Sequence, residues 1–183
     1  MAVRFNKIFI PNEVYFVTFT ILNWQPIFIN DQFRALVFKW FDYMKNSYGN
    51  KIYGYVIMPN HLHLLLKVTD HSPKLSVVVQ NAKRFLAYGI VKLLKADDNQ
   101  KLLKIFAAQA RTREGANYKV FEDKYDSLLI ASVDFFLEKL NYIHKNPCAE
   151  YWHLADCPEN YAYSSAANYI LGRGDYEVDL MDF

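Results

Sequence analysis

The stretch that decides the fold runs from Lys51 to Val68 and reads KIYGYVIMPNHLHLLLKV. Residues 51–58 and 61–68 are rich in β-branched, aromatic and leucine side chains, which is typical of strands. Met58-Pro59-Asn60 lies between these runs and forms a tight connection. The stretch therefore predicts a β-hairpin whose side chains alternate between the two faces of a sheet.

The segments on either side of this hairpin predict an α+β fold. Asp31 and Ser132 are suitable N-caps for two helices, and Pro147 ends the second of them. The order of elements is the ferredoxin-like βαββαβ pattern of an antiparallel sheet, with one added helix and a tail. We expect helices on one face of the sheet and a free second face that could carry a site. The expected strands are 14–22, 51–58, 61–68 and one within 119–130, and the expected helices are 31–47, 74–95, a short one around 101–110 in an otherwise polar stretch, and 133–146.

Composition indicates one globular domain over 1–183, with a core at about 14–147 and an extension at 148–183. Hydrophobic residues make up 52% and charged residues 22% of the 183 residues, which excludes a disordered chain. No apolar run approaches the ~18 residues of a membrane helix. The N-terminus does not read as a signal peptide, so we expect a cytoplasmic protein with no membrane partner.

His61 and His63 are the first candidate site. They stand two apart on a predicted strand, so both imidazoles point to the same face, opposite Leu62 and Leu64. Two neighbouring imidazoles can hold a divalent metal ion. A bare His-x-His pair is more often two surface or hydrogen-bonded histidines on a sheet edge, and the spacing alone does not exclude that interpretation.

Tyr142 and Asn146 are four residues apart on the predicted helix 133–146 and share one face. At about 100° per residue, Tyr142 falls almost opposite the expected apolar stripe. Tyr142 is therefore not needed for core packing, although it could cover a second surface, and Asn146 could simply end the helix. The expected stripe consists of Val133, Phe136, Leu137, Leu140 and Ile143.

These motifs resemble a known family when taken in order. The segment 58–66, with His61-Leu62-His63, resembles the His-hydrophobic-His motif of the HUH transposases. The segment 142–147 resembles the nucleophile helix of that family, and 161–169 resembles the segment that follows it in REP-associated tyrosine transposases. The resemblance extends from Tyr15 to about Tyr169.

The resemblance implies a metal-dependent endonuclease and strand transferase that acts on single-stranded or hairpin DNA. His61, His63 and Asn146 would hold Mg²⁺ or Mn²⁺, and Tyr142 would attack the scissile phosphate to form a 5′-phosphotyrosine. Phenols ionise only near pH ~10, so the attacking hydroxyl needs a nearby cation. The oligomeric state stays open between a monomer and a homodimer.

Basic side chains supply candidates for DNA backbone contact. The net charge of +2 is too small to indicate nucleic-acid binding, but residues 92–119 hold seven basic and three acidic side chains. Two alternatives remain: a domesticated DNA-binding protein without transposition, and a ferredoxin-like RNA-binding module that uses the sheet aromatics Tyr53 and Tyr55. The candidate contacts are Lys83, Arg84, Lys101, Lys104, Arg111 and Arg113.

Overall fold

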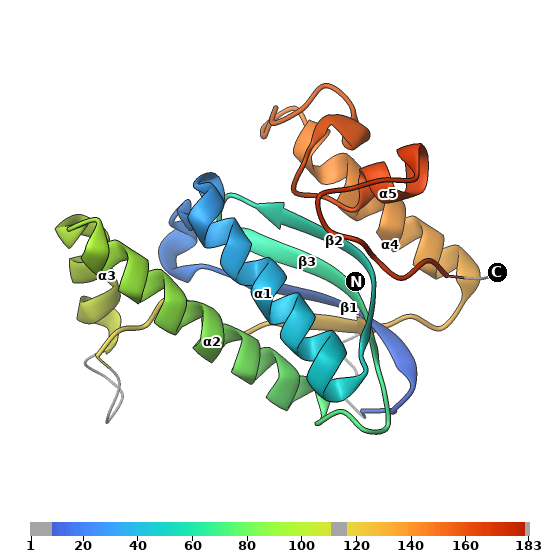
Figure 1. Ribbon diagram of the computed structural model, residues 1–183, viewed down its shortest axis with the longest axis horizontal. Coiled ribbons are helices and arrows are strands. Elements are labelled where there is room, and N and C mark those ends of the chain that lie inside the picture. Colours follow the sequence, from blue (N-terminus) through green and yellow to red (C-terminus); the bar gives the residue numbers. More distant parts are fainter. Residues whose placement is uncertain (1–8, 111–116, 182–183) are drawn as a thin grey trace.

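The computed structural model describes residues 9–110 and 117–181, and Figure 1 shows the arrangement of its layers. Four strands form one sheet in the order β2-β3-β1-β4, and each neighbouring pair is antiparallel. The predicted α+β fold with an antiparallel sheet is confirmed. The strands are β1 (Glu13–Thr20), β2 (Lys51–Met58), β3 (His61–Val68) and β4 (Asp126–Leu129), and the helices are α1 (Asp31–Tyr48), α2 (Leu75–Ala96), α3 (Gln100–Ala110), α4 (Val133–Lys145) and α5 (Ala166–Leu171).

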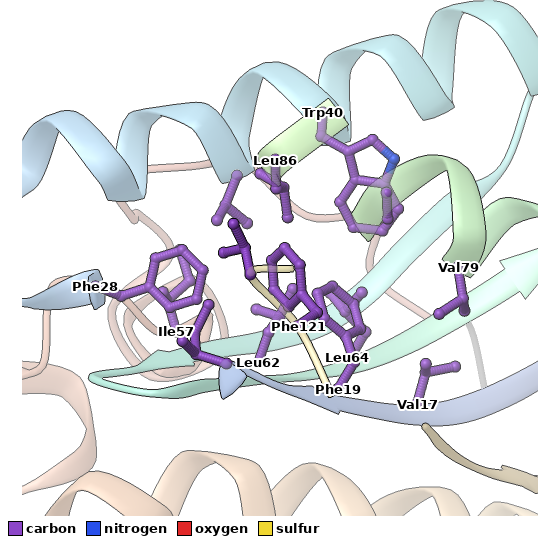
Figure 2. Packing of buried hydrophobic residues seen from close by; sticks show 14 of the residues in the cluster. Val17, Phe19, Phe28, Trp40, Ile57, Leu62, Leu64, Val79, Leu86 and Phe121 are labelled. Carbon is purple, nitrogen blue, oxygen red and sulfur yellow. The ribbon is translucent and has the colours of Figure 1, made fainter. Parts of the chain in front are cut away.

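Helices α1 and α2 cover one face of the sheet, and the larger hydrophobic core lies between these two layers (Figure 1). Figure 2 shows Trp40 of α1 and Leu86 of α2 pointing toward the sheet, where Phe19 and Leu64 meet them. These four side chains are at most 1% exposed. Alternation along the strands therefore sends Leu62, Leu64 and Leu66 to this core, as the sequence predicts.

The second face of the sheet is not free, so the expectation of an uncovered face is wrong. Helix α4 crosses it, and a smaller core lies between α4 and strands β1, β2 and β3. A Cβ at Gly54 of β2 would lie 2.8 Å from the Leu140 Cδ1 atom of α4 and 3.0 Å from the Ile143 Cδ1 atom. The bare backbone at Gly54 therefore lets α4 approach the sheet closely.

The buried stripe of α4 differs from the predicted one. Phe136, Leu140 and Ile143 are buried, whereas Val133 is 49% and Leu137 is 44% exposed. The apolar stripe is narrower than predicted, and His144 is the fourth buried residue of α4. The His144 Nε2 atom lies 2.9 Å from the Ser165 hydroxyl.

The position of Tyr142 relative to the observed buried stripe also differs from the prediction. Six residues at about 100° each place Tyr142 roughly 120° from Phe136 around the helix. The phenol therefore lies on a flank of α4 and not opposite the core stripe.

Two strand boundaries also differ from prediction. Strand β1 ends at Thr20, and a short 3-10 turn, Leu22–Trp24, follows because Asn23 and Trp24 adopt left-handed backbone angles. Strand β4 covers only Asp126–Leu129 of the predicted 119–130 range. In the segment before β4, the carbonyls of residues 122–124 accept hydrogen bonds from the Lys83 ammonium. The pairing of this segment with the chain after β1 is therefore limited to an isolated β-bridge between Ile21 and Phe121.

The C-terminal extension lies along the exposed edge of β2. The Ile57 N–H donates to the Tyr163 carbonyl at 2.9 Å, and the Ser165 N–H donates to the Tyr55 carbonyl at 3.0 Å. Farther along, the Asp179 N–H donates to the Ile52 carbonyl at 2.8 Å. These bonds occupy backbone groups that would otherwise leave the edge open to another strand. Within the described ranges, the helices are too short or too polar to cross a membrane.

Phe136 anchors α4 to the sheet, and its truncation should reduce stability. Phe136 is fully buried and meets Tyr53 edge to face, with ring centroids 5.9 Å apart. Phe136→Ala should lower the free energy of unfolding by about 3–5 kcal/mol because it leaves a cavity. Leu137→Ala, one residue along and 44% exposed, is the control and should change it by less than about 0.5 kcal/mol. Denaturant titration of both variants measures the difference, and equal losses would contradict the anchoring role.

Candidate active site

His61 and His63 open strand β3 on the face that α4 covers. In the register with β1, His63 pairs with Thr18 and His61 pairs with Thr20. Both imidazoles are buried, with 7% and 5% exposure. Their Nε2 atoms lie 3.1 Å apart. The structure thus places the two rings on one face, as the alternation predicts, with their nitrogens facing each other.

Neighbouring residues orient both rings. The Asn60 amide donates from Nδ2 to the Trp24 carbonyl at 3.3 Å, which turns its Oδ1 toward His61 Nδ1 at 2.7 Å. An amide oxygen only accepts, so His61 carries its proton on Nδ1 and presents an unprotonated Nε2. On the other ring, His63 Nδ1 lies 2.6 Å from the Thr18 hydroxyl. Such partners at Nδ1 are typical of histidines that bind metals through Nε2.

Asn146 completes the group from α4. Its Nδ2 lies 3.3 Å from His63 Nε2, and its Oδ1 is buried without a hydrogen-bond partner. Amide oxygen and nitrogen are interchangeable by a half-turn of the side chain. A half-turn would aim the unsatisfied oxygen at the imidazole nitrogens, where a cation would satisfy all three atoms. The residues present therefore fit a divalent ion.

The ligand set is small for a metal site. Over residues 9–110 and 117–181, no three His, Cys, Asp or Glu side chains gather closely enough to hold an ion. A cation at His61 and His63 would thus take its third protein ligand from the amide of Asn146 and keep other positions for solvent or substrate. This open coordination is typical of catalytic metal sites and not of closed structural ones.

Burial keeps both imidazoles neutral. It lowers the pKa of His61 to about 4, and together with the nearby His61 it lowers the pKa of His63 to about 3. Metal ions bind the neutral imidazole, so both rings are ready to bind over the whole physiological pH range.

Tyr142 stands beside the two rings. Its ring centroid is 5.4 Å from that of His63, in an edge contact with an interplanar angle of 74°. Phe16 stacks on His63 at 5.4 Å and also contacts Tyr142 at 6.0 Å. Tyr142 is nevertheless 48% exposed. The flank of α4 therefore holds this phenol against the histidine pair and leaves it open to a substrate from solvent.

Lys139 lies on the same flank of α4, and the sequence interpretation missed it. Its Nζ is 5.9 Å from the Phe16 ring centroid and 5.0 Å from that of Phe135, and it pairs with Glu138 at 2.8 Å. One helical turn separates Lys139 from Tyr142, which the i, i+3 spacing could have indicated. Lys139 and Tyr142 both contact the Phe16 ring, so the two side chains lie near each other.

Four of the six predicted basic residues lie in the described parts of the chain, on α2 and α3 and not on α4 beside the histidines. Lys83 donates to the carbonyls of Glu122, Asp123 and Lys124 at 2.8–3.2 Å, which gives it a role in holding the segment before β4. Arg84 is exposed on α2, and Lys101 and Lys104 are exposed on α3. Arg111 and Arg113 lie outside the described residues. These positions stay predictions as DNA contacts.

The sheet aromatics do not provide an RNA-binding surface. Tyr53 is 6% exposed beneath α4, and Tyr55 is fully buried on the α1 side. Stacking on bases requires an accessible ring face. The predicted RNA-binding alternative that uses Tyr53 and Tyr55 is therefore wrong, because neither ring presents an accessible face.

Asn60, the second residue that sequence reasoning missed, is expected to control metal affinity. Asn60→Leu removes the acceptor that holds the proton on His61 Nδ1, and it should weaken Mn²⁺ binding about 10- to 100-fold. Asn60→Asp keeps an acceptor at that position and should retain most of the affinity. Calorimetric titration of each variant with Mn²⁺ measures the effect. Equal affinity of the Leu variant and the unaltered chain would show that the tautomer is set elsewhere.

Comparison with known proteins supports the fold. The chain matches no family model and no curated protein. Among solved structures, it is similar over 100% of its length to a REP-associated tyrosine transposase bound to a REP hairpin, with 95% of that chain covered, a TM-score of 0.66 and 16% identity. A protein of Deinococcus radiodurans, provisionally described as a transposase, aligns over 78% of this chain and 97% of its own, with a TM-score of 0.46 and 16% identity. The first likeness shows that the two chains share a fold.

Proposed function

We propose that this chain is a single-tyrosine HUH transposase of the REP-associated kind, a metal-dependent endonuclease and strand transferase for hairpin-bearing single-stranded DNA. One observation carries the proposal. The half-exposed phenol of Tyr142 contacts His63, whose Nε2 atom faces both His61 Nε2 and the Asn146 amide. A nucleophile and a cation site thus meet on one surface, on a fold shared with a protein that binds a REP hairpin.

His61, His63 and Asn146 would hold the ion. Magnesium prefers oxygen ligands and manganese tolerates imidazole better, so both Mg²⁺ and Mn²⁺ suit two nitrogens and one amide oxygen. When bound, the ion would polarise a non-bridging oxygen of the scissile phosphate and offset the negative charge that develops there.

Tyr142 would then act as the nucleophile. Its hydroxyl oxygen forms a bond to phosphorus and releases its proton, while the bond from phosphorus to the 3′ oxygen of the neighbouring nucleotide breaks. The departing oxygen takes up a proton and becomes a 3′-OH, and the 5′-phosphate stays on Tyr142. In the reverse direction another 3′-OH attacks the phosphotyrosine, so a new phosphodiester forms without a nucleotide cofactor.

The chain positions these groups through local structure. Tyr142 and Asn146 are one helical turn apart, and the Asn146 N–H donates to the Tyr142 carbonyl as the helix cap. The strand fixes the two imidazoles, and Phe16 lies against both His63 and Tyr142. Movement of the phenol relative to the cation site is therefore restricted before the substrate arrives, which favours attack.

DNA binding would extend beyond this centre. Lys139 is the basic side chain that we place beside the nucleophile, and Arg84, Lys101 and Lys104 remain candidates for contacts with more distant phosphates. Lys83 is left out because its ammonium already serves three carbonyls. The state of assembly, monomer or homodimer, stays open within this proposal.

The test is a covalent trap. The full chain is incubated in Mn²⁺ or Mg²⁺ with a DNA hairpin that carries a single-stranded flank. The label is placed on the cleavage fragment whose 5′-phosphate would become attached to Tyr142. A labelled protein band that survives denaturation and maps to Tyr142 is the expected result. Binding of the hairpin without cleavage in either metal would favour a domesticated DNA-binding protein instead.

A further inference from the structure

We infer that Trp24 and Trp152 form a base-stacking clamp around His61, which takes unpaired bases of the DNA strand next to the scissile phosphate. This inference rests on the proposed function for its location, and it adds a subsite for the bases. We call these two indoles the indole clamp. Both contact the same imidazole: the Trp24 centroid is 6.2 Å and the Trp152 centroid is 5.9 Å from that of His61.

Trp24 is held in an unfavourable conformation that exposes it. Its φ is 55°, directly after Asn23 with a φ of 52°, and left-handed angles are rare for bulky side chains. The Asn60 amide binds the Trp24 carbonyl, so the residue that orients His61 also holds this turn. The indole is 62% exposed. Strain that presents a large aromatic ring to solvent beside a cation site indicates a functional role.

Trp152 contacts His61 from a different segment of the chain, and its side chain is half-buried against the smaller core. It lies in the turn that follows Asn146–Cys148, where its N–H donates to the Ala149 carbonyl at 2.8 Å. Tyr151, 78% exposed, extends this surface with its ring centroid 5.6 Å from that of Trp152. Each indole centroid lies about 6 Å from the same imidazole, so the two indoles are within about 12 Å of each other, which one or two nucleotides can span.

The chemistry around His61 indicates that the indole clamp binds unpaired DNA bases. A phosphate bound through the cation would lie close to His61, and its attached sugar and base could reach the two indoles that contact His61. Base–aromatic stacking is independent of sequence because every base has a π face. Paired bases are already stacked inside a duplex, so the clamp favours the unpaired flank over the hairpin stem.

The test compares two single strands with the same phosphates. One is a 12-nucleotide thymidine strand, and the other is a 12-residue strand without bases. Binding in Mn²⁺ is measured by fluorescence anisotropy, with every protein carrying Tyr142→Phe so that cleavage cannot interfere. Trp24→Leu and Trp152→Leu should each weaken binding of the thymidine strand about tenfold. Neither should change binding of the base-free strand.

Control variants separate stacking from folding. Tyr88→Leu removes an aromatic ring that is 78% exposed on α2 and should leave both affinities unchanged. Trp24→Phe and Trp152→Phe keep an aromatic face and should recover most of the affinity. Equal losses on both strands in the Leu variants would overturn the clamp, as would unchanged binding of the thymidine strand or tighter binding of a matching uridine RNA.

Failure of this inference is distinct from failure of the proposed function. The difference in affinity between the two strands, measured in the Tyr142→Phe background, reports stacking, whereas the covalent trap reports the chemical step. A chain that forms the Tyr142 adduct but whose affinity for the thymidine strand is unchanged by Trp24→Leu and Trp152→Leu has the activity without the clamp. A chain that discriminates between the strands but forms no adduct has the clamp without the activity.

Discussion

Tyr142→Phe should abolish strand cleavage and leave DNA binding largely intact. The substitution removes one oxygen from a side chain that is 48% exposed, so the ring contacts with Phe16 and His63 remain. Without the nucleophile, no phosphotyrosine can form, and we expect a fall in cleavage rate of at least about 1,000-fold. Gel analysis of a labelled hairpin with a single-stranded flank measures cleavage, and anisotropy on the same DNA measures binding.

The matched control is Tyr88→Phe, which removes the same oxygen from an exposed tyrosine on α2. Its cleavage rate should equal that of the unaltered chain. Cleavage at the full rate by Tyr142→Phe would refute the nucleophile assignment. Loss of cleavage together with loss of binding would instead assign Tyr142 to DNA contact.

His61→Ala and His63→Ala should each remove metal-dependent cleavage. Each substitution removes one of the two imidazole nitrogens that would bind the ion. Among the described residues, no group of three or more His, Cys, Asp or Glu side chains could hold the ion in their place. The remaining imidazole and the Asn146 amide would hold Mn²⁺ too weakly for millimolar metal to fill the site. We expect at least a 100-fold loss of cleavage and the loss of a measurable calorimetric signal for Mn²⁺.

His71→Ala serves as the control, because the His71 side chain is 89% exposed in the turn after β3. It should retain both metal binding and cleavage. Addition of a chelator to the unaltered chain should reproduce the effect of His61→Ala, and restored Mn²⁺ should reverse it. Cleavage that continues unchanged in chelator would contradict the metal role of the histidines.

Short-range patterns were enough to predict much of the molecule. The alternation in 51–68 predicted both hairpin strands and the shared face of His61 and His63, because a strand sends every second side chain to the same side. The four-residue spacing likewise predicted that Tyr142 and Asn146 share a side of α4. These inferences need only the geometry of a single element, which the chain carries locally.

Other features depended on how the elements pack. The sequence interpretation left the second sheet face open, because nothing local shows that α4 crosses it over Gly54. Burial, which depends on this packing, lowers the pKa of His61 and, together with the nearby His61, that of His63, and it encloses an Asn146 oxygen that has no hydrogen-bond partner. The carbonyl partners of Lys83 could not be predicted for the same reason, since they lie about forty residues away in the sequence.

The sequence by itself therefore determined the order of elements, the sheet and the two halves of the candidate site, one on a strand and one on a helix. The tertiary structure alone decided that these halves meet, with the phenol of Tyr142 against His63 and the indoles of Trp24 and Trp152 around His61. The physical reason is that periodicity specifies which way a side chain points within its own element. Contacts between distant elements depend on the volume and shape of everything packed between them.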